Sequence, residues 1–142
     1  MLKEAHGVTS FLQSNDKILI LLRSEQVSTY QGKWGGISGS IDDGKTADAQ
    51  ALLEIVEETN LSEQDIELIK KGEPLVFDDE VLYLRKVVYP YLFRVRDRRR
   101  IKIDWEHKEL RWIRPEDLGD YDTMPKLKET LAQVLSLQKD GQ

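Results

Sequence analysis

The stretch that decides the fold is residues 35–61, which read GGISGSIDDGKTADAQALLEIVEETNL. Its second half predicts a helix that carries Glu54, Glu57 and Glu58. At about 100° per residue, these three side chains leave the helix within an arc of roughly 100°, so they form one acidic stripe. Like charges at this spacing repel each other. A divalent cation such as Mg²⁺ or Mn²⁺, which prefers hard oxygen ligands, would remove the conflict.

A solvated acidic helix face is the alternative interpretation of the stripe. Against it, apolar residues occupy most of the remaining circumference, which predicts a helix packed on more than one side: Ala47, Ala49, Ala51, Leu52, Leu53, Ile55 and Val56. Upstream, glycines at 35, 36, 39 and 44 allow the backbone to approach a ligand closely. The loop enters the helix at about Thr46, a suitable N-cap. Loop amides and a metal would then face one cavity.

The same stretch resembles the signature of the Nudix family. That signature is a glycine, five residues, a glutamate, seven residues, then arginine, glutamate, an aliphatic residue, any residue, two glutamates, any residue, glycine and an aliphatic residue. The matching positions in this chain are Gly39, Glu54, Ile55, Glu57, Glu58 and Leu61. The resemblance to these MutT-like hydrolases implies that Glu54, Glu57 and Glu58 are the metal ligands.

Three positions depart from the signature and make the box degenerate. Lys45 stands at the first glutamate, Leu53 at the arginine and Asn60 at the late glycine. Asn60 is a mild change, because asparagine also tolerates the left-handed conformation of a helix C-cap. In the family, the arginine and the first glutamate help to hold the metal-binding carboxylates. Their loss implies weaker support for a ligand set that is otherwise intact.

The resemblance spans nearly the whole chain and implies a single Nudix domain over residues 1–142. The implied fold is a three-layer α/β/α sandwich with a mixed central sheet. The implied activity is Mg²⁺- or Mn²⁺-dependent hydrolysis of a nucleoside diphosphate linked to another moiety, with Glu58 or Glu106 as the group that takes a proton from water. Substrate contacts are expected at Arg23, Gly36 and Gly39; a solvated strand end is the alternative for Arg23.

Two other functions stay open. The departures at Lys45 and Leu53 motivate a nucleotide-binding or regulatory module with weakened chemistry. Five arginines between positions 94 and 100 motivate RNA binding or a phosphate clamp, although solvated charges at the tip of a hairpin are the favoured interpretation. A narrower resemblance, in WEHKELRW and YDTMPKLKETL, is to Nudix domains found beside eIF2B-related sequences in archaeal proteins, and it bears on a partner rather than on a substrate.

Composition limits the class of protein. With 142 residues, 39% of them hydrophobic, the chain is long enough for one domain with a core. A net charge of −5 disfavours a general nucleic-acid binder, and the absence of cysteine excludes thiolate metal sites and disulfides. The longest apolar run, residues 18–22, is too short for a membrane span, and the N-terminus lacks a signal-peptide core. We therefore expect a cytoplasmic protein, with a homodimer through an exposed sheet edge as an open possibility.

Along the chain, residues 5–13 and 17–23 predict a hairpin at the centre of the sheet, with the second strand covered on both faces. Residues 66–77 and 81–95 are rich in β-forming residues. Residues 123–138 predict an amphipathic helix that packs on the sheet face opposite the glutamate helix. Its expected core positions are Leu127, Leu131, Val134 and Leu135.

Several single residues allow two interpretations. Trp34 is expected as a core or loop anchor rather than a base-stacking platform. The triplet at residues 78–80 is expected as a hairpin turn rather than a second metal site. In DWEHKELRW, residues 104–112, the resemblance implies an extra metal ligand or general base at Glu106, or else at Glu109. His107 is expected at the surface, with a proton shuttle as the alternative.

Overall fold

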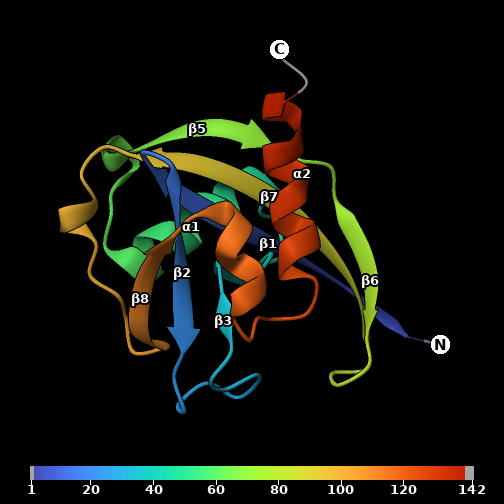
Figure 1. Cartoon of the computed structure of the whole chain (residues 1–142). Helices are drawn as coiled ribbons and strands as arrows, with labels where there is room; N and C mark the ends of the chain where they lie inside the picture. Colours follow the sequence, from blue (N-terminus) through green and yellow to red (C-terminus); the bar gives the residue numbers. More distant parts are fainter. Residues whose placement is uncertain (1, 140–142) are drawn as a thin grey trace.

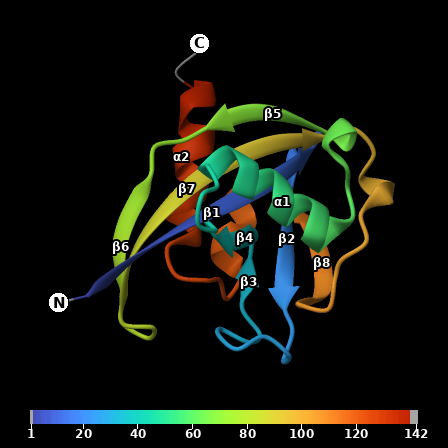
Figure 2. The same cartoon turned by 180° about the vertical axis from the view of Figure 1, so that it is seen from behind.

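The computed structural model describes residues 2–139 of the chain. These residues form one eight-stranded sheet with an α-helix on each face (Figures 1 and 2). The strands are β1 (Lys3–Ser14), β2 (Lys17–Arg23), β3 (Trp34–Gly35), β4 (Ile37–Ser40), β5 (Ile66–Lys71), β6 (Leu75–Asp79), β7 (Leu84–Val95) and β8 (His107–Ile113). The helices are α1 (Ala47–Thr59) and α2 (Leu127–Lys139), and three 3-10 segments are η1 (Glu63–Asp65), η2 (Arg98–Arg100) and η3 (Pro115–Asp120).

The sheet is mixed, as predicted. Its main path runs β3-β2-β1-β7-β5, while β4 pairs with β1, β6 with β7 and β8 with β2. Strand β1 lies at the centre; it is parallel to β7 and antiparallel to β2 and β4. The predicted central hairpin of β1 and β2 is therefore confirmed.

Strands β1 and β2 diverge soon after their turn. Only the pairs Gln13↔Ile18 and Ser14↔Lys17 join them, after which β4 pairs with β1 and β3 pairs with β2. Gly36 lies where β3 and β4 meet, and a Cβ atom there would lie 3.0 Å from the carbonyl oxygen of Ser10. Glycine suits this position because a side chain would crowd the backbone of β1. Strands β3 and β4, which pair with the diverging β2 and β1, lead the chain directly into the loop before α1.

Two hydrophobic cores lie on opposite faces of the sheet. Along β2, Leu19 and Leu21 belong to the core beneath α1, whereas Ile18 and Ile20 belong to the core beneath α2. Successive side chains of a strand point to opposite faces, so this apolar run serves both cores. The predicted burial of β2 on both faces and the predicted placement of α2 opposite α1 are both confirmed (Figures 1 and 2).

Helix α1 begins and ends where its capping residues indicate. The side chain of Thr46 accepts a hydrogen bond from the Ala49 N–H at 3.1 Å, and Asn60 has φ 62° at the C-cap. Its burial differs from the prediction, however, because the buried residues all lie on one face: Gln50, Ala51, Ile55, Glu58 and Thr59. Val56 on the outer face is exposed. The expectation that α1 packs on more than one side is wrong, since the sheet covers one face of it.

Helix α2 begins later than predicted. The expected start was residue 123, but the helix begins at Leu127 after a turn through Pro125 and Lys126. Lys126 has φ 63°, a left-handed conformation that separates the turn from the helix. The core spacing was predicted well: Leu127, Leu131 and Val134 are buried, and Leu135 packs against them. No helix within the described part of the chain is long and apolar enough to cross a membrane.

The acidic triplet at 78–80 closes the hairpin of β6 and β7, as predicted. Asp79 ends β6, and its carboxylate accepts the N–H groups of Val81 and Leu82 at 3.0 Å each. A carboxylate that accepts nearby backbone N–H groups stabilises a tight turn. The triplet therefore has a structural role at this corner.

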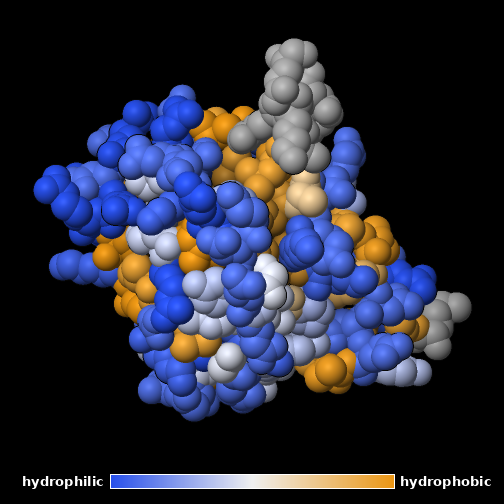
Figure 3. Space-filling model, viewed as in Figure 1, coloured by the Kyte–Doolittle hydropathy of each residue, from blue (hydrophilic) through white to orange (hydrophobic). Residues whose placement is uncertain are grey.

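The arginine cluster begins with Arg94 near the end of β7 and continues into the connection to β8, which includes η2. Since β8 pairs with β2 and not with β7, the predicted hairpin tip is wrong. The five arginines engage separate neighbours: Arg94 with Glu67, Arg96 with the Gln64 carbonyl, Arg98 with the Trp112 ring, Arg99 with Asp97 and Arg100 with Asp65. On the face viewed in Figure 3, hydrophilic residues predominate and hydrophobic ones form scattered groups between them.

Candidate active site

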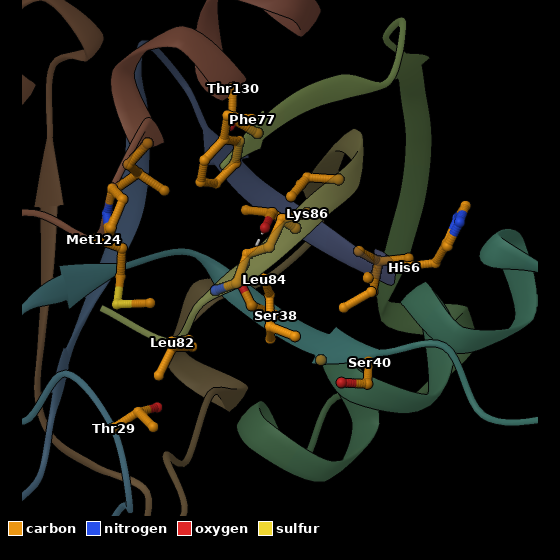
Figure 4. A pocket seen from close by; sticks show the side chains of 18 of the residues that line it. His6, Thr29, Ser38, Ser40, Phe77, Leu82, Leu84, Lys86, Met124 and Thr130 are labelled. Carbon is orange, nitrogen blue, oxygen red and sulfur yellow. Dashed lines mark hydrogen bonds between the residues drawn. The ribbon is translucent and has the colours of Figure 1, made fainter. Parts of the chain in front are cut away.

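A cavity of about 340 Å³ opens beside the central strands and the start of α2. Its lining comes from β1, β4, the β6–β7 hairpin, the end of β2, the loop at 24–33 and the start of α2 (Figure 4). This volume lies at the lower end of the range for small-molecule sites. The cavity is thus large enough for one compact organic ligand.

The cavity walls combine apolar and polar side chains. One part is apolar and consists of Phe77, Leu82, Leu84, Val88 and Met124. Along β7, Leu84, Lys86 and Val88 alternate in sequence and so share one face, which brings a cation into the lining (Figure 4). Lys86 was not expected at the site from the sequence. The alternation at 84, 86 and 88 was the available signal, but the faces of this strand were not assignable without its partners.

Glu58 is the most unusual carboxyl group of the site. It is 2% exposed, and its Oε2 atom has no hydrogen-bond partner. Burial, followed by a hydrogen bond and charge repulsion from Glu54 and by the charges of Glu106 and Asp104, raises the pKa of Glu58 to about 11. A buried carboxyl oxygen without a partner is costly, so this position lacks a positive or donating group.

Glu54 faces Glu58 from one turn earlier in α1. A Cβ atom added to Gly39 would lie 2.3 Å from the Glu54 carboxyl carbon, so the carboxylate rests against the backbone of β4. On its other side, the Gln50 side-chain amide donates to Glu54 Oε2 at 2.6 Å. Gly39 also lines the cavity. Only glycine at position 39 leaves room for this carboxylate.

Glu57 does not join the other two glutamates. It is exposed, because it lies at the outer edge of the acidic stripe and the sheet covers the opposite edge. Among the residues that the structure describes, no three histidine, aspartate or glutamate side chains are arranged as a group that could hold a metal ion. The helix thus presents Glu54 and Glu58 to the interior and leaves Glu57 in solvent.

Glu106 reaches the same region from the segment before β8. The Ser24 N–H donates to the Glu106 carbonyl at 2.8 Å, and the Ser24 hydroxyl donates to the Trp105 carbonyl at 2.9 Å. These bonds fix the backbone of the segment against the end of β2. The Glu106 side chain lines the cavity, and burial together with the nearby Asp104 and Glu54 carboxylates raises its pKa. Glu109, the second choice, lies on β8 and pairs with Arg111.

His107 is buried, so the expected surface position is wrong. The register of β2 and β8 places it opposite Arg23, inside the sheet. Its Nδ1 atom lies 3.2 Å from Asp104 Oδ1, and its Nε2 atom lies 3.7 Å from Glu58 Oε1. Burial lowers the pKa of His107 despite the neighbouring Asp104 carboxylate. The pairing partner of β8 decided this placement, and the sequence alone did not reveal it.

Arg23 lies at the end of β2 and lines the cavity. Its Nε and Nη2 atoms donate to the Thr29 carbonyl at 3.1 and 2.9 Å, which holds the guanidinium in place. Its positive charge also acts to lower the pKa of Glu106. Of the two predicted glycine contacts, Gly39 lines the cavity, whereas Gly36 is not among the lining residues and packs against β1.

Asp79 ties two segments of the cavity rim together. The Tyr30 hydroxyl lies 2.7 and 2.8 Å from the two carboxylate oxygens of Asp79, and Lys86 Nζ lies 3.1 Å away. Burial, with the hydrogen bond and charge of Asp79, raises the pKa of Tyr30 to about 12. These contacts of Asp79 join the 24–33 loop to the β6–β7 hairpin. Trp34, by contrast, is a core anchor as predicted, buried against Tyr121 and Arg111.

The carboxylate chemistry of Glu54, Glu58 and Glu106 suits a hard divalent cation, although no three side chains of the described residues stand ready as a ligand group. The charges of Glu54 and Glu106 are close enough to raise the pKa of Glu58. The buried Oε2 atom of Glu58 has no hydrogen-bond partner. Carboxylate oxygens are the ligands that Mg²⁺ and Mn²⁺ prefer. A cation there would relieve both the repulsion and the unmet hydrogen bond.

Comparison with known proteins identifies the family. The NUDIX domain family matches residues 1–136, which is nearly the whole chain. The chain belongs to this family, that of the MutT-like Nudix hydrolases, which the sequence signature had indicated.

Two curated relatives carry the description nucleoside triphosphatase NudI. One, from Escherichia fergusonii, is 23% identical over 137 residues and covers 88% of this chain and 92% of the relative. Another, from Escherichia coli O81, is 24% identical over 136 residues and covers 87% of this chain and 92% of the relative. The similarity therefore extends over almost the full length of both proteins.

Solved structures show the same fold. A C. elegans Ap4A hydrolase superposes with a TM-score of 0.74 at 19% identity and covers 99% of this chain and 100% of its own. The E. coli dihydroneopterin triphosphate pyrophosphohydrolase superposes with a TM-score of 0.76 at 18% identity, with 94% and 96% coverage. At these identities the likeness establishes the fold alone.

Proposed function

We propose that this protein is a metal-dependent pyrophosphohydrolase that acts on a nucleoside diphosphate linked to another moiety. The observation that carries the proposal is the buried Glu58 carboxyl with an unpartnered oxygen, near Glu54, Asp104 and Glu106, of which Glu106 lines a ligand-sized cavity. The relatives described as nucleoside triphosphatases make nucleoside triphosphates the first members of this class to test.

The metal is proposed to bind at Glu54, Glu57 and Glu58. Mg²⁺ or Mn²⁺ bound there would neutralise phosphate charge and lower the pKa of bound water. Glu54 and Glu58 already face the interior, whereas Glu57 is exposed and keeps its assigned role through the resemblance to the family signature.

Two further groups are proposed to act on the substrate. Arg23, held by the Thr29 carbonyl, presents a fixed guanidinium to a phosphate at the cavity wall. Glu106 lines the same cavity, and its raised pKa brings it closer to the range in which a carboxylate accepts a proton efficiently. Gly39 lines the same cavity, where its backbone supports close approach of the phosphate chain.

A nucleotide-binding or regulatory module with weakened chemistry is the second candidate. It is favoured by the lack of a ready group of three metal-binding side chains in the described residues, and by Lys45 and Leu53 at two box positions. This candidate predicts that a nucleotide stabilises the protein without being converted to product. A partner related to eIF2B stays a prediction from the resemblance of the late segments.

Hydrolysis of a nucleotide panel separates the two candidates. The panel contains nucleoside triphosphates, ADP-ribose, sugar nucleotides and dinucleoside polyphosphates, each with Mg²⁺, Mn²⁺ or EDTA. We expect metal-dependent turnover in the wild type that is lost in Glu57→Gln and kept in Glu63→Gln, a matched change at an exposed glutamate outside the cavity. Turnover that survives in Glu57→Gln would overturn the ligand assignment, and no turnover with ligand-induced stabilisation would favour the binding module.

A further inference from the structure

Gln50 is a buried polar residue in the first half of α1. It is 1% exposed, and both ends of its side-chain amide are hydrogen-bonded. The Oε1 atom accepts the N–H of Asp42 at 3.0 Å, and the Nε2 atom donates to Glu54 Oε2 at 2.6 Å. One side chain therefore connects the loop before α1 to a glutamate of the site.

The orientation of this amide is fixed by chemistry. A backbone N–H can only donate, so the group that faces Asp42 must be the amide oxygen. The amide nitrogen then faces Glu54, whose ionised carboxylate can only accept. A flipped amide would place two donors together at Asp42 and two acceptors together at Glu54. The two contacts thus support a single arrangement.

The carboxylate of Glu54 is consequently held from two sides. A Cβ on Gly39 would lie within 2.6 Å of both its oxygens, which shows how closely the β4 backbone approaches. On the other side, the Gln50 amide nitrogen donates a hydrogen bond to Glu54 Oε2. This arrangement restrains rotation of the carboxylate and leaves Oε1 as the oxygen without a bond to Gln50.

We propose that Gln50 is a positioning residue that holds the Glu54 carboxylate so that Oε1 is presented to the metal. The inference rests on the proposed function, because it concerns the same metal site. Groups that orient a metal ligand typically change metal affinity by 10- to 100-fold when they are removed. Gln50 also makes the orientation of Glu54 depend on the loop at Asp42.

The test measures Mn²⁺ binding by electron paramagnetic resonance on the wild type, Gln50→Met and Gln64→Met. Methionine has nearly the shape of glutamine but cannot donate a hydrogen bond. We expect the Mn²⁺ Kd to rise about tenfold in Gln50→Met. Gln64 is exposed in η1, so Gln64→Met should leave the Kd unchanged. An equal Kd in the wild type and Gln50→Met would overturn the inference.

A double-mutant cycle separates positioning from a general loss of structure. If Gln50 acts through Glu54, then Gln50→Met should have no further effect on the Mn²⁺ Kd in a Glu54→Gln background. An unchanged tenfold effect in that background would overturn the inference. A wild type that binds no Mn²⁺ would instead overturn the proposed function, so the two failures are distinguishable.

If Gln50→Met does not fold, the wild type provides the test. Mn²⁺ broadens NMR signals of nearby protons, so the side-chain amide signal of Gln50 should disappear at lower Mn²⁺ than that of Gln64. Equal broadening of the two amides would overturn the inference.

Discussion

Two buried carboxyl groups in this protein have opposite surroundings. Asp79 is 3% exposed and accepts from the Tyr30 hydroxyl, the Lys86 ammonium and two backbone N–H groups. Glu58 is 2% exposed, has one oxygen without a partner and is surrounded by other carboxylates. Burial acts to raise the pKa of both, but the donors around Asp79 outweigh burial and lower its pKa, whereas the pKa of Glu58 rises to about 11.

The comparison separates a structural carboxylate from a functional one. The bonds of Asp79 are all made within the chain, so the group stabilises the rim of the cavity whether or not a ligand is bound. The chain leaves one oxygen of Glu58 without a partner, and a cation supplied from outside would occupy it. Buried ionisable groups in unfavourable surroundings occur typically at functional sites.

The largest expected effect is on catalysis at Glu58. Glu58→Gln keeps the shape but cannot supply a carboxylate to a bound metal, and we expect turnover of the best nucleotide substrate to fall by about 10²- to 10³-fold, the loss typical for one electrostatic stabiliser of a transition state. Steady-state kinetics at saturating Mg²⁺ measure it, with Glu63→Gln as the control. Turnover within twofold of the wild type would show that Glu58 is structural after all.

The next effect is on stability at Asp79. Asp79→Ala leaves the Lys86 ammonium and the Tyr30 hydroxyl without their buried partner, and we expect the free energy of unfolding to fall by about 3 kcal/mol. Urea unfolding at neutral pH measures this. Asp78 next to it is exposed and pairs with Arg85, so Asp78→Ala should change little. Equal losses in the two variants would contradict the structural role of Asp79.

A smaller effect is expected at Tyr30. Tyr30→Phe removes only the hydroxyl that donates to Asp79, and a hydrogen bond to a charged group contributes about 1.5 kcal/mol. The free energy of unfolding should fall by about that amount. In the Asp79→Ala background the same change should have almost no effect, because the acceptor is already gone. Full additivity of the two changes would show that the bond is not formed in solution.

The pH dependence of stability distinguishes Asp79 further. Its pKa is lowered in the folded state, so its contribution is present above the pKa of the unfolded chain, which is about 3.9 for aspartate, and is lost as the pH falls through the folded-state value. The difference in free energy of unfolding between the wild type and Asp79→Ala should therefore stay level between pH 7 and about pH 5 and shrink as the pH falls from there toward pH 3. A difference that stays constant over this range would show that the charge of Asp79 does not contribute.

Much of the fold was predictable because local chemistry determines it. Thr46 and Asn60 mark the ends of α1 through their capping preferences, and the apolar run of β2 indicates burial on both faces. The start of α2 was placed too early, because Pro125, a residue typical of the first turn of a helix, lies here in the turn that precedes it. Local rules do not reveal where such a turn stops.

The site was predictable only in part. The spacing of Glu54, Glu57 and Glu58 located α1 as its centre, but the outward position of Glu57 depends on how the helix lies on the sheet. The burial of His107 depends on the pairing of β8 with β2, which joins segments distant in sequence. Gln50 gave no signal of its own, since a glutamine at i−4 from a glutamate is common on solvated helices.

The most direct test of the central claim is the effect of Mg²⁺ on the melting temperature of the wild type and of Glu58→Gln. At a Mg²⁺ concentration about ten times the Kd, the wild type should melt about 4 °C higher than in EDTA, because the cation completes the Glu58 site. Glu58→Gln should melt above the wild type in EDTA and gain nothing from Mg²⁺. An equal Mg²⁺-induced rise in both proteins would contradict the claim that Glu58 is held ready for a metal.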